Sequence, residues 1–351
     1  MKRRIVQGAF LVLAFSLAFQ QAKAADDPEP ALYGWGFQNF STKKFSWDIY
    51  CHSFFGVPSD SNTAWMSSGF DLAFYDNVFK EKLPDPGGTG NGAGNCFGLS
   101  ILSLMMNKFG GYLGFCGPPV RQGSAVNSDG SPANAALTRA INIMHGHQLS
   151  VACINEYIQQ SLPDLGVQPR AQKAHYGVAL AKQTIDKEGP CLVSITKTWS
   201  PLSGGHTLIA YKVTGSPGNE RIWVVDPNRL WADTASDQRG WYKAKSNYIQ
   251  ISGSGGDTWQ YRMAGKNSDW PTDGDDTMSG QPLGTGNLII IPASVAGPTG
   301  RTPSSLGLSA IGIIAKIYLW AHDYGRYCPP VHPTVEKSVI SFQPTLLDAS
   351  R

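Results

Sequence analysis

Hydrophobic positions change their spacing near the middle of the chain. In the first half apolar residues recur at helical intervals, which predicts helices over residues 96–108, from Ser131 onward, over 152–160 and over 172–188. In the second half, short runs rich in Val, Ile, Thr and Tyr predict strands over residues 191–196, 207–213, 222–225, 248–252, 258–263 and 287–292. Helices followed by strands favour an α+β fold.

The first predicted helix, residues 96–108, has apolar side chains nearly all round, so we expect it to be buried in the centre of the fold. The next helix is predicted to begin with Ser131 as its N-cap and Pro132 at the first helical position. The Gly- and Asn-rich residues 85–95 and residues 110–130 are expected to be loops.

The N-terminus has the three parts of a signal peptide. Lys2, Arg3 and Arg4 give a positive start, residues 6–19 are apolar, and Ala22-Lys23-Ala24 matches a cleavage site. We therefore expect residues 1–24 to be removed after Ala24 and the protein to be secreted or periplasmic.

Charge gives no reason to expect a nucleic acid as partner. The chain has a formal net charge of +3, but the signal segment holds four basic residues and no acidic one, so the exported part is close to neutral. Charged residues make up 16% of the chain, and 39 glycines and 23 prolines indicate a folded, loop-rich protein.

Composition divides the exported chain into three segments. Residues 25–84 are aromatic-rich and irregular in pattern, and we expect them to pack on the domain that follows, with a removable pro-segment as the alternative. Residues 85–295 hold the predicted α+β domain. Residues 296–351 form a C-terminal extension, whose apolar stretch 306–321 is expected to pack on the core rather than contact a membrane.

Two groups of potential metal ligands are predicted not to form metal sites. His145 and His147 are two positions apart and so do not share a helix face. The other group lies in a predicted loop over residues 268–286, where the spacing of the acidic residues matches no calcium-binding loop. These acidic residues are Asp269, Asp273, Asp275 and Asp276.

The chain has six cysteines, for which the simplest expectation in an exported protein is three disulfides. If Cys96 is free, at least one more cysteine is unpaired. We expect this to be Cys191, because its surroundings, "GPCLVSI", predict a buried strand. The others are Cys51, Cys116, Cys153 and Cys328.

Three residues capable of joint chemistry follow one another along the chain. Cys96 stands where the Gly-rich loop meets the central helix, His206 opens the strand sequence "HTLIAY", and Asp226 ends the next strand in "WVVDPN". Antiparallel pairing would place His206 beside Asp226, and the helix would bring Cys96 to them. Each also has a structural interpretation, since Cys96 could form a disulfide, His206 could be a hydrogen-bonded core residue and Asp226 could belong to a turn.

Together these residue types suit nucleophilic catalysis by a thiolate. A helix N-terminus and a neighbouring imidazolium both favour the thiolate form of Cys96. His206 would act as base and acid, and a carboxylate at its far nitrogen would fix its tautomer. The Cys96 amide, with Asn91 or Asn95, would bind an oxyanion.

The stretches "GNCFGLS", "GGHTLIAY" and "WVVDPN" resemble the papain-like cysteine peptidase superfamily, in particular a bacterial branch with the order Cys, His, Asp. The resemblance implies a papain-like fold, in which a helical part carrying the Cys helix packs against an antiparallel sheet or barrel. It also implies Cys96 as nucleophile, His206 as general base and Asp226 as orienting residue, with Asn228 as the alternative for the last role.

The reaction that the resemblance implies is hydrolysis of a peptide or amide bond, in a peptide or protein substrate, through an acyl-enzyme on Cys96 and with no cofactor. Two alternatives remain open. A transglutaminase-like or transpeptidase-like acyl transferase, or a cell-wall amidase, would use the same three residues. A non-catalytic exported binding module would instead hold Cys96 in a disulfide.

Overall fold

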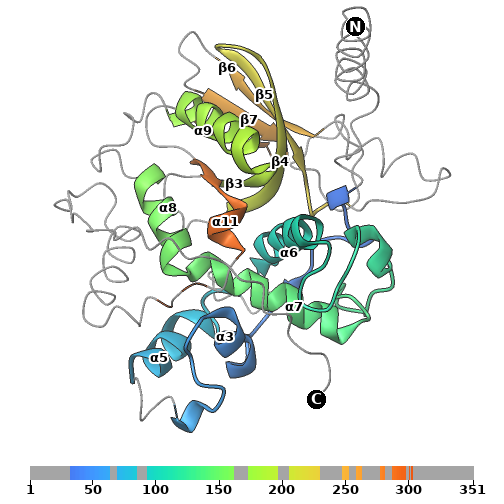
Figure 1. Ribbon diagram of the computed structural model, residues 1–351, viewed down its shortest axis with the longest axis vertical. Coiled ribbons are helices and arrows are strands. Elements are labelled where there is room, and N and C mark those ends of the chain that lie inside the picture. The colour runs from blue at the N-terminus through green and yellow to red at the C-terminus, as the bar shows by residue number, and fades with distance from the viewer. Residues whose placement is uncertain are drawn as a thin grey trace, which may run out of the picture.

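The computed structural model shows a helical part packed against an antiparallel sheet, which confirms the α+β class expected from the order of the elements (Figure 1). It describes residues 32–63, 69–84, 93–161, 173–196, 205–229, 247–252, 258–262, 277–280, 287–297, 300 and 302.

The helical elements include two 3₁₀ turns, η3 and η4, and one π-helix, η2. In chain order they are α3 (Trp47–Ser53), α5 (Gly69–Phe74), η2 (Tyr75–Phe79), α6 (Cys96–Phe109), η3 (Pro119–Gln122), α7 (Ala135–Gly146), η4 (His147–Leu149), α8 (Val151–Ser161), α9 (Lys173–Glu188) and α11 (Ala293–Ala296). The strands are β1 (Ser41–Thr42), β2 (Ala93–Gly94), β3 (Cys191–Thr196), β4 (Gly205–Ser216), β5 (Asn219–Val225), β6 (Tyr248–Ser252), β7 (Thr258–Arg262), β8 (Thr277–Gly280) and β9 (Leu288–Ile291).

Among the residues that the structure describes, seven strands form the main sheet in the order β8-β7-β6-β5-β4-β3-β9, and β1 pairs separately with β2. The six predicted strands are all present. The prediction of a loop over residues 268–286 is wrong at residues 277–280, because these form β8, which pairs with β7 at the edge of the sheet. The sequence of β8, TMSG, lacks the run of apolar β-branched residues that made β9, LIII, predictable at the other edge of the sheet.

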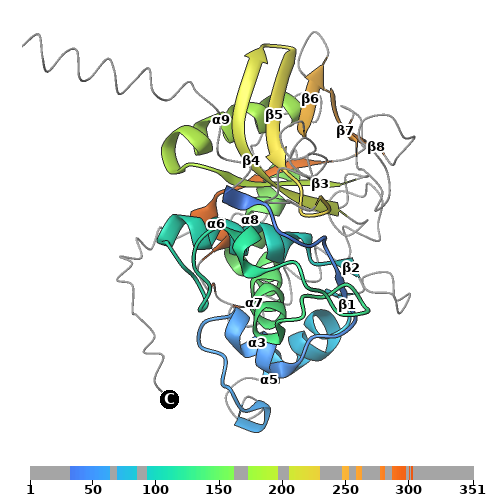
Figure 2. The same cartoon turned by 90° about the vertical axis from the view of Figure 1, so that its right-hand side faces the viewer.

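Buried side chains on the two faces of the sheet belong to different hydrophobic cores. Figure 2 shows α6 and α9, whose residues contribute to these cores, on either side of β3 and β4. Alternate residues of a strand point to opposite faces. Accordingly, Leu192 and Ile209 belong to the core that contains α6. Their neighbours Val193 and Leu208 belong to the core on the other face, with residues of α9.

The central position predicted for the first helix is confirmed. Every residue of α6 from Phe97 to Met106 is buried, and no acidic residue lies in its first turn. The helix contacts α7 and β4, so it lies between the helical part and the sheet. Its N-terminus is therefore held at the boundary between the two parts of the molecule.

The predicted start of the next helix is wrong. The N-cap of α7 is Asn134, whose side chain accepts hydrogen bonds from the N–H groups of Ala136 and Leu137. Ser131 is held instead by Asp129, whose carboxylate accepts bonds from the Ser131 N–H and hydroxyl at 2.9 and 2.6 Å. Ser131, which the sequence pattern predicted as the N-cap, is therefore part of a tight turn with Asp129 instead.

The aromatic residues of the N-terminal segment pack onto the fold, as predicted. Trp35, Phe37 and Phe40 are buried in the core that contains α6, and Phe45 and Phe54 are buried in a third core beside α7. The segment is less irregular than expected, because it forms α3, α5 and η2. Two of its members depart from the prediction, since Phe55 is 72% exposed and Trp47 is only partly buried.

The cysteines of the described residues are all free. Cys191 is buried and unpaired, as predicted. The expectation of disulfides is wrong for Cys51, Cys116 and Cys153. Cys153 lies in the core that contains α6, on the opposite face of the sheet from Cys191, so these two buried thiols cannot meet.

Several predictions fall outside the described residues: the signal peptide 1–24, Asn91, the acidic residues between 269 and 276, the apolar stretch 306–321, and Cys328. Among the residues that the structure does describe, no helix has both the length and the apolar character needed to span a membrane.

Candidate active site

Close helix packing positions Cys96 at the N-terminus of α6. A Cβ atom added to Gly98 would lie 2.2 Å from the carbonyl oxygen of Ile141 in α7, so only glycine permits this approach. The Ser100 hydroxyl donates to the carbonyl oxygen of Thr207 at 3.1 Å, which ties the N-terminal part of α6 to β4. Cys96 is thereby brought to the start of β4.

Strand pairing places His206 and Asp226 together, as the antiparallel arrangement predicted. Ile209 of β4 is opposite Val225 of β5, so the residue after β5 lies beside the beginning of β4. His206 Nε2 and Asp226 Oδ1 are 2.7 Å apart, and both side chains are almost fully buried.

The third member completes the cluster, because the side chains of Cys96 and His206 are hydrogen-bonded. Since Nε2 of the imidazole is bound to Asp226, Nδ1 is the nitrogen that faces the thiol. The structure thus brings Cys96, His206 and Asp226 into one contiguous chain of contacts.

The electrostatic interactions among Cys96, His206 and Asp226 favour a thiolate on Cys96 and an imidazolium on His206. Burial disfavours the thiolate of Cys96, but the hydrogen bond and charge of His206, with the backbone N–H groups of Thr207 and Phe97, outweigh it and lower the pKa of Cys96. Burial also disfavours a charged imidazole, yet the charge and hydrogen bond of Asp226 raise the pKa of His206 to about 10. A thiolate paired with an imidazolium is the form of cysteine that attacks carbonyl carbon.

Asp226 is held from several sides. Its Oδ1 accepts from His206 and from the backbone N–H of Asn228 at 2.8 Å, while its Oδ2 accepts from the Tyr261 hydroxyl and lies 3.9 Å from Arg229 Nε. Burial raises the pKa of Asp226, but His206, Tyr261 and the Asn228 N–H outweigh it, and the net pKa is lowered. The carboxylate is therefore ionised and fixed in orientation.

Sequence reasoning missed Tyr261. This residue lies on β7, and its hydroxyl reaches Asp226 only because β5, β6 and β7 are adjacent in the sheet. The sole signal in the sequence is the inward-facing position of Tyr261 in an alternating strand. A tyrosine that only packs in the core would have the same position, so this signal does not identify a functional residue.

Of the side chains predicted to bind the oxyanion, Asn95 is engaged elsewhere. The Asn95 side chain donates to the Thr42 hydroxyl at 2.8 Å, and Thr42 donates to Asn142 Oδ1 at 3.1 Å. Although Asn95 is the N-cap of α6, its side chain makes no capping bond, so it leaves the first N–H groups of the helix to other partners. One of them, the Phe97 N–H, bonds to the Cys96 thiol.

Asn228 does not orient His206 through its side chain. Its Oδ1 accepts a hydrogen bond from Asn39 Nδ2 at 2.9 Å, and its backbone N–H binds Asp226. The alternative role predicted for Asn228 is therefore wrong, since the residue acts on the carboxylate and not on the imidazole.

His145 and His147 are both buried within the helical part. Burial lowers the pKa of His145 to about 3 and that of His147 to about 4, so both are neutral. His147 Nδ1 lies 3.0 Å from the carbonyl oxygen of Ala296, which gives it a structural role between η4 and α11.

A further group of potential ligand atoms among the described residues lies on α3. Asp48, Cys51 and His52 have one such atom each within 4.8 Å of the others. Arg139 donates to both carboxylate oxygens of Asp48, at 2.6 and 2.9 Å, and His52 Nδ1 lies 2.8 Å from the Asp48 carbonyl oxygen. Because these partners compete with a cation, we interpret the group as an exposed ion-pair cluster.

The described residues thus contain one constellation suited to covalent chemistry, formed by Cys96, His206 and Asp226. Comparison with known proteins adds nothing to this geometry, since no family model, no curated protein and no solved structure matches the chain.

Proposed function

We propose that this protein is an exported thiol hydrolase that cleaves peptide or amide bonds through an acyl-enzyme on Cys96, with a fold of the papain-like kind. The observation that carries the proposal is the continuous contact from Cys96 at a helix N-terminus, through the His206 imidazole, to the buried Asp226 carboxylate. In a purely structural cluster, this series of hydrogen-bonded side chains would not need to end in a thiol.

In the first half of the reaction, the Cys96 thiolate attacks the carbonyl carbon of the substrate and forms a C–S bond. The oxyanion of the tetrahedral intermediate is stabilised by N–H groups at the start of α6. The imidazolium of His206 then gives its Nδ1 proton to the leaving amine, the C–N bond breaks, and a thioester remains on Cys96.

In the second half, neutral His206 takes a proton from water, and the resulting hydroxide attacks the thioester. The carboxylic acid leaves, and Cys96 departs as a thiolate beside the regenerated imidazolium. Asp226 keeps the same oxygen bound to Nε2 throughout, so the imidazole does not change its orientation between the two halves.

A simple activated ester tests the proposal without knowledge of the natural substrate. The mature protein incubated with p-nitrophenyl acetate should release p-nitrophenolate, and mass spectrometry after a rapid acid quench should find an acetyl group on Cys96. Cys96→Ala should abolish both signals, and His206→Ala should reduce them by about two orders of magnitude or more.

Cys191→Ala is the matched control, because Cys191 is also a free thiol but lies buried in the sheet. It should leave both signals unchanged. If Cys96 in the folded protein is not acetylated, or is acetylated at the same rate in His206→Ala, the proposal is wrong.

A further inference from the structure

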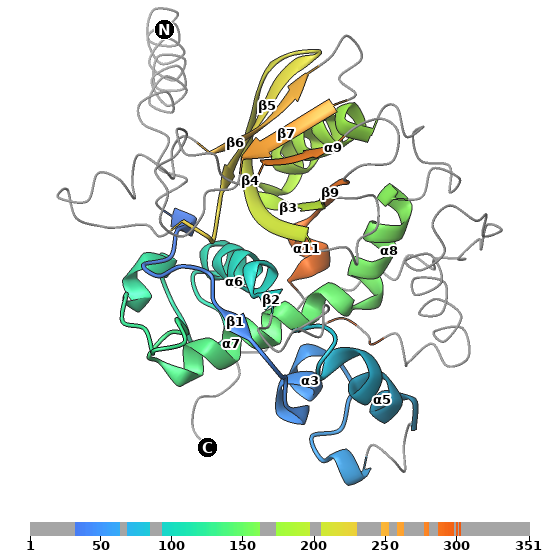
Figure 3. The ribbon, with the colours of Figure 1, turned by 180° about the vertical axis from the view of Figure 1, so that it is seen from behind.

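The N-terminal segment joins the two parts of the molecule at the candidate active site. We call residues 39–42 the clasp. Near its start, the Asn39 N–H donates to the carbonyl oxygen of Pro227 at 2.8 Å. Further along, the Phe40 carbonyl accepts from the Asn95 N–H at 3.0 Å, and β1 pairs with β2, the strand that directly precedes Asn95 (Figure 3). The clasp therefore touches both the turn after Asp226 and the residue before Cys96.

The side chain of Asn39 continues this link toward the imidazole. Its Nδ2 donates to Asn228 Oδ1 at 2.9 Å, and the Asn228 N–H donates to Asp226 Oδ1 at 2.8 Å. This carboxylate oxygen is the one that binds His206 Nε2 at 2.7 Å. A series of three hydrogen bonds thus connects Asn39 to His206.

The same side chain also fixes the loop before Cys96. A Cβ atom on Gly94 would lie 2.2 Å from Asn39 Nδ2, so the amide of Asn39 occupies the space that any side chain at position 94 would need. Among the described residues, Asn39 Oδ1 is buried without a hydrogen-bond partner. The Asn39 side chain is therefore hydrogen-bonded through Nδ2, to Asn228, and this bond needs an amide donor at position 39.

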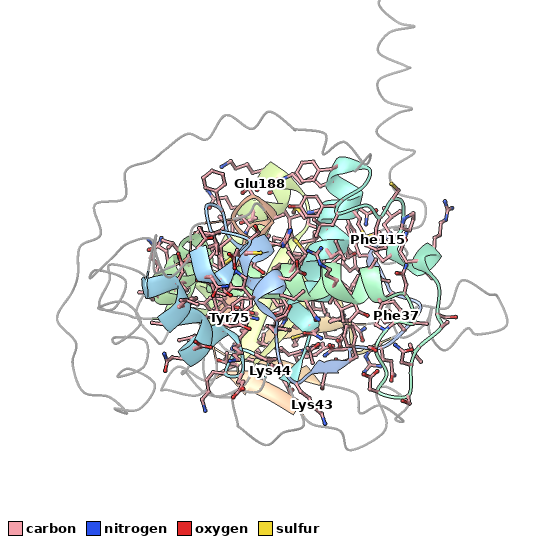
Figure 4. The ribbon with its side chains drawn as sticks, turned by 90° about the horizontal axis from the view of Figure 1, so that it is seen from below. Phe37, Lys43, Lys44, Tyr75, Phe115 and Glu188 are labelled. Carbon is pink, nitrogen blue, oxygen red and sulfur yellow. The ribbon has the colours of Figure 1, made fainter. Side chains whose placement is uncertain are left out.

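The other residues of the clasp make different contacts. Phe40 is buried in the core that contains α6, and the Thr42 hydroxyl accepts a hydrogen bond from the Asn95 side chain. Ser41 is exposed, and so are Lys43 and Lys44, which follow β1 and lie at the rim of the molecule in Figure 4. Asn39 is thus the residue of the clasp whose side chain bonds to the turn of residues 226–228.

We propose that Asn39 is a positioning residue for the triad: it holds the turn of residues 226–228 against the loop before Cys96 and so sets the contact between Cys96 and His206. This inference rests on the proposed function. Asn39 acts through Asn228 and Asp226 and takes no part in bond formation itself.

The test measures the pH dependence of Cys96 alkylation by iodoacetamide in the full mature chain, by mass spectrometry. Asn39→Ala should raise the apparent pKa of Cys96 toward that of an ordinary thiol, and a rise of one unit would slow alkylation about tenfold on the acidic side. Asn228→Ala removes the same hydrogen bond from its other end and should give a similar shift. Ser41→Ala, in the same segment, should give none.

The double variant Asn39→Ala/Asn228→Ala should shift the pKa no further than the larger of the two single changes, because both remove one interaction. If Asn39→Ala does not fold, the pKa of Cys96 in Asn228→Ala tests the positioning role by itself, because this substitution leaves the clasp unchanged.

The outcomes separate this inference from the function on which it rests. If His206→Ala raises the pKa of Cys96 while the Asn39 and Asn228 variants do not, the positioning role is wrong and the catalytic pair stands. The same conclusion follows if these variants only lower the melting temperature. If His206→Ala also leaves the pKa of Cys96 unchanged, the proposed function itself is overturned.

Discussion

Asp226→Asn is the substitution whose result follows most directly from the geometry. Asp226 Oδ1 accepts from two N–H groups, those of His206 and Asn228, and Oδ2 accepts from the Tyr261 hydroxyl. The two N–H groups cannot become acceptors while His206 is charged, whereas a hydroxyl can rotate and accept. We therefore expect the new amide to turn its oxygen to His206 and its NH₂ group to Tyr261. The substitution then removes the charge but keeps the orientation of the imidazole.

The size of the effect follows from the pKa of His206. This pKa is raised to about 10 from an ordinary value of 6.5, and the charge of Asp226 is the largest of the effects that raise it. Without that charge, burial lowers the pKa of the imidazole, and the hydrogen bond and charge of Cys96 oppose it only in part. A fall of about three units corresponds to about 4 kcal/mol of lost imidazolium stabilisation, or at most about a thousandfold in rate if the whole loss is felt in the transition state.

The assay is the rate of Cys96 acetylation by p-nitrophenyl acetate, with circular dichroism to measure the folded fraction. Asp186→Asn is the control, since Asp186 is an exposed aspartate whose carboxylate pairs with Lys182 at 2.7 Å. It should leave the rate unchanged. A rate per folded molecule within about twofold of the unmodified protein in Asp226→Asn would refute the reasoning, because the charge of Asp226 would then have no part in forming the reactive pair.

Four further results are expected. The rate of Cys96 acylation should rise with pH through the lowered pKa of Cys96 and fall again as His206 loses its proton near pH 10; a single rise that continues to the ordinary thiol range would contradict the ion pair. Cys191, whose pKa burial raises to about 12, should resist iodoacetamide until the protein unfolds, and rapid labelling in the folded state would show that its strand is not buried. Gly98→Ala should lower the free energy of unfolding in urea by about 1–3 kcal/mol and slow acylation, because its methyl group would overlap a carbonyl of α7; an unchanged denaturation midpoint would be inconsistent with the observed helix approach. Limited trypsin digestion should leave residues 32–42 attached, since they hold buried aromatic residues, and their early loss with an intact remainder would favour a removable pro-segment.

The sequence by itself predicted several of the helices and strands and the three candidate reactive residues. Hydrophobic spacing located α6 as a buried helix and the strands β3, β4, β5, β6, β7 and β9, because burial of one helix face or one strand face imposes a period that is visible over a few residues. The reactive residues were found because each stands at the boundary of such an element: Cys96 opens a helix, His206 lies at the start of a strand and Asp226 follows the end of one. Antiparallel pairing of neighbouring strands then sufficed to bring two of them together.

Only the tertiary structure decided which groups surround them. Asn39 bonds to Asn228 in the turn after Asp226, and Tyr261 bonds to the Asp226 carboxylate. The residues of each pair are far apart in the sequence, so the periodic pattern of a single helix or strand could not predict these contacts. Local rules failed where a distant partner competed for a side chain: Asn95 stands at an N-cap, yet its amide binds Thr42 instead of capping α6. A side chain takes the hydrogen-bond partner that the folded neighbourhood places within reach, and that neighbourhood is set by the packing of α6 between α7 and the sheet. The sequence therefore specified the candidate reactive residues, while the contacts that orient them and shift their pKa values were decided by the fold.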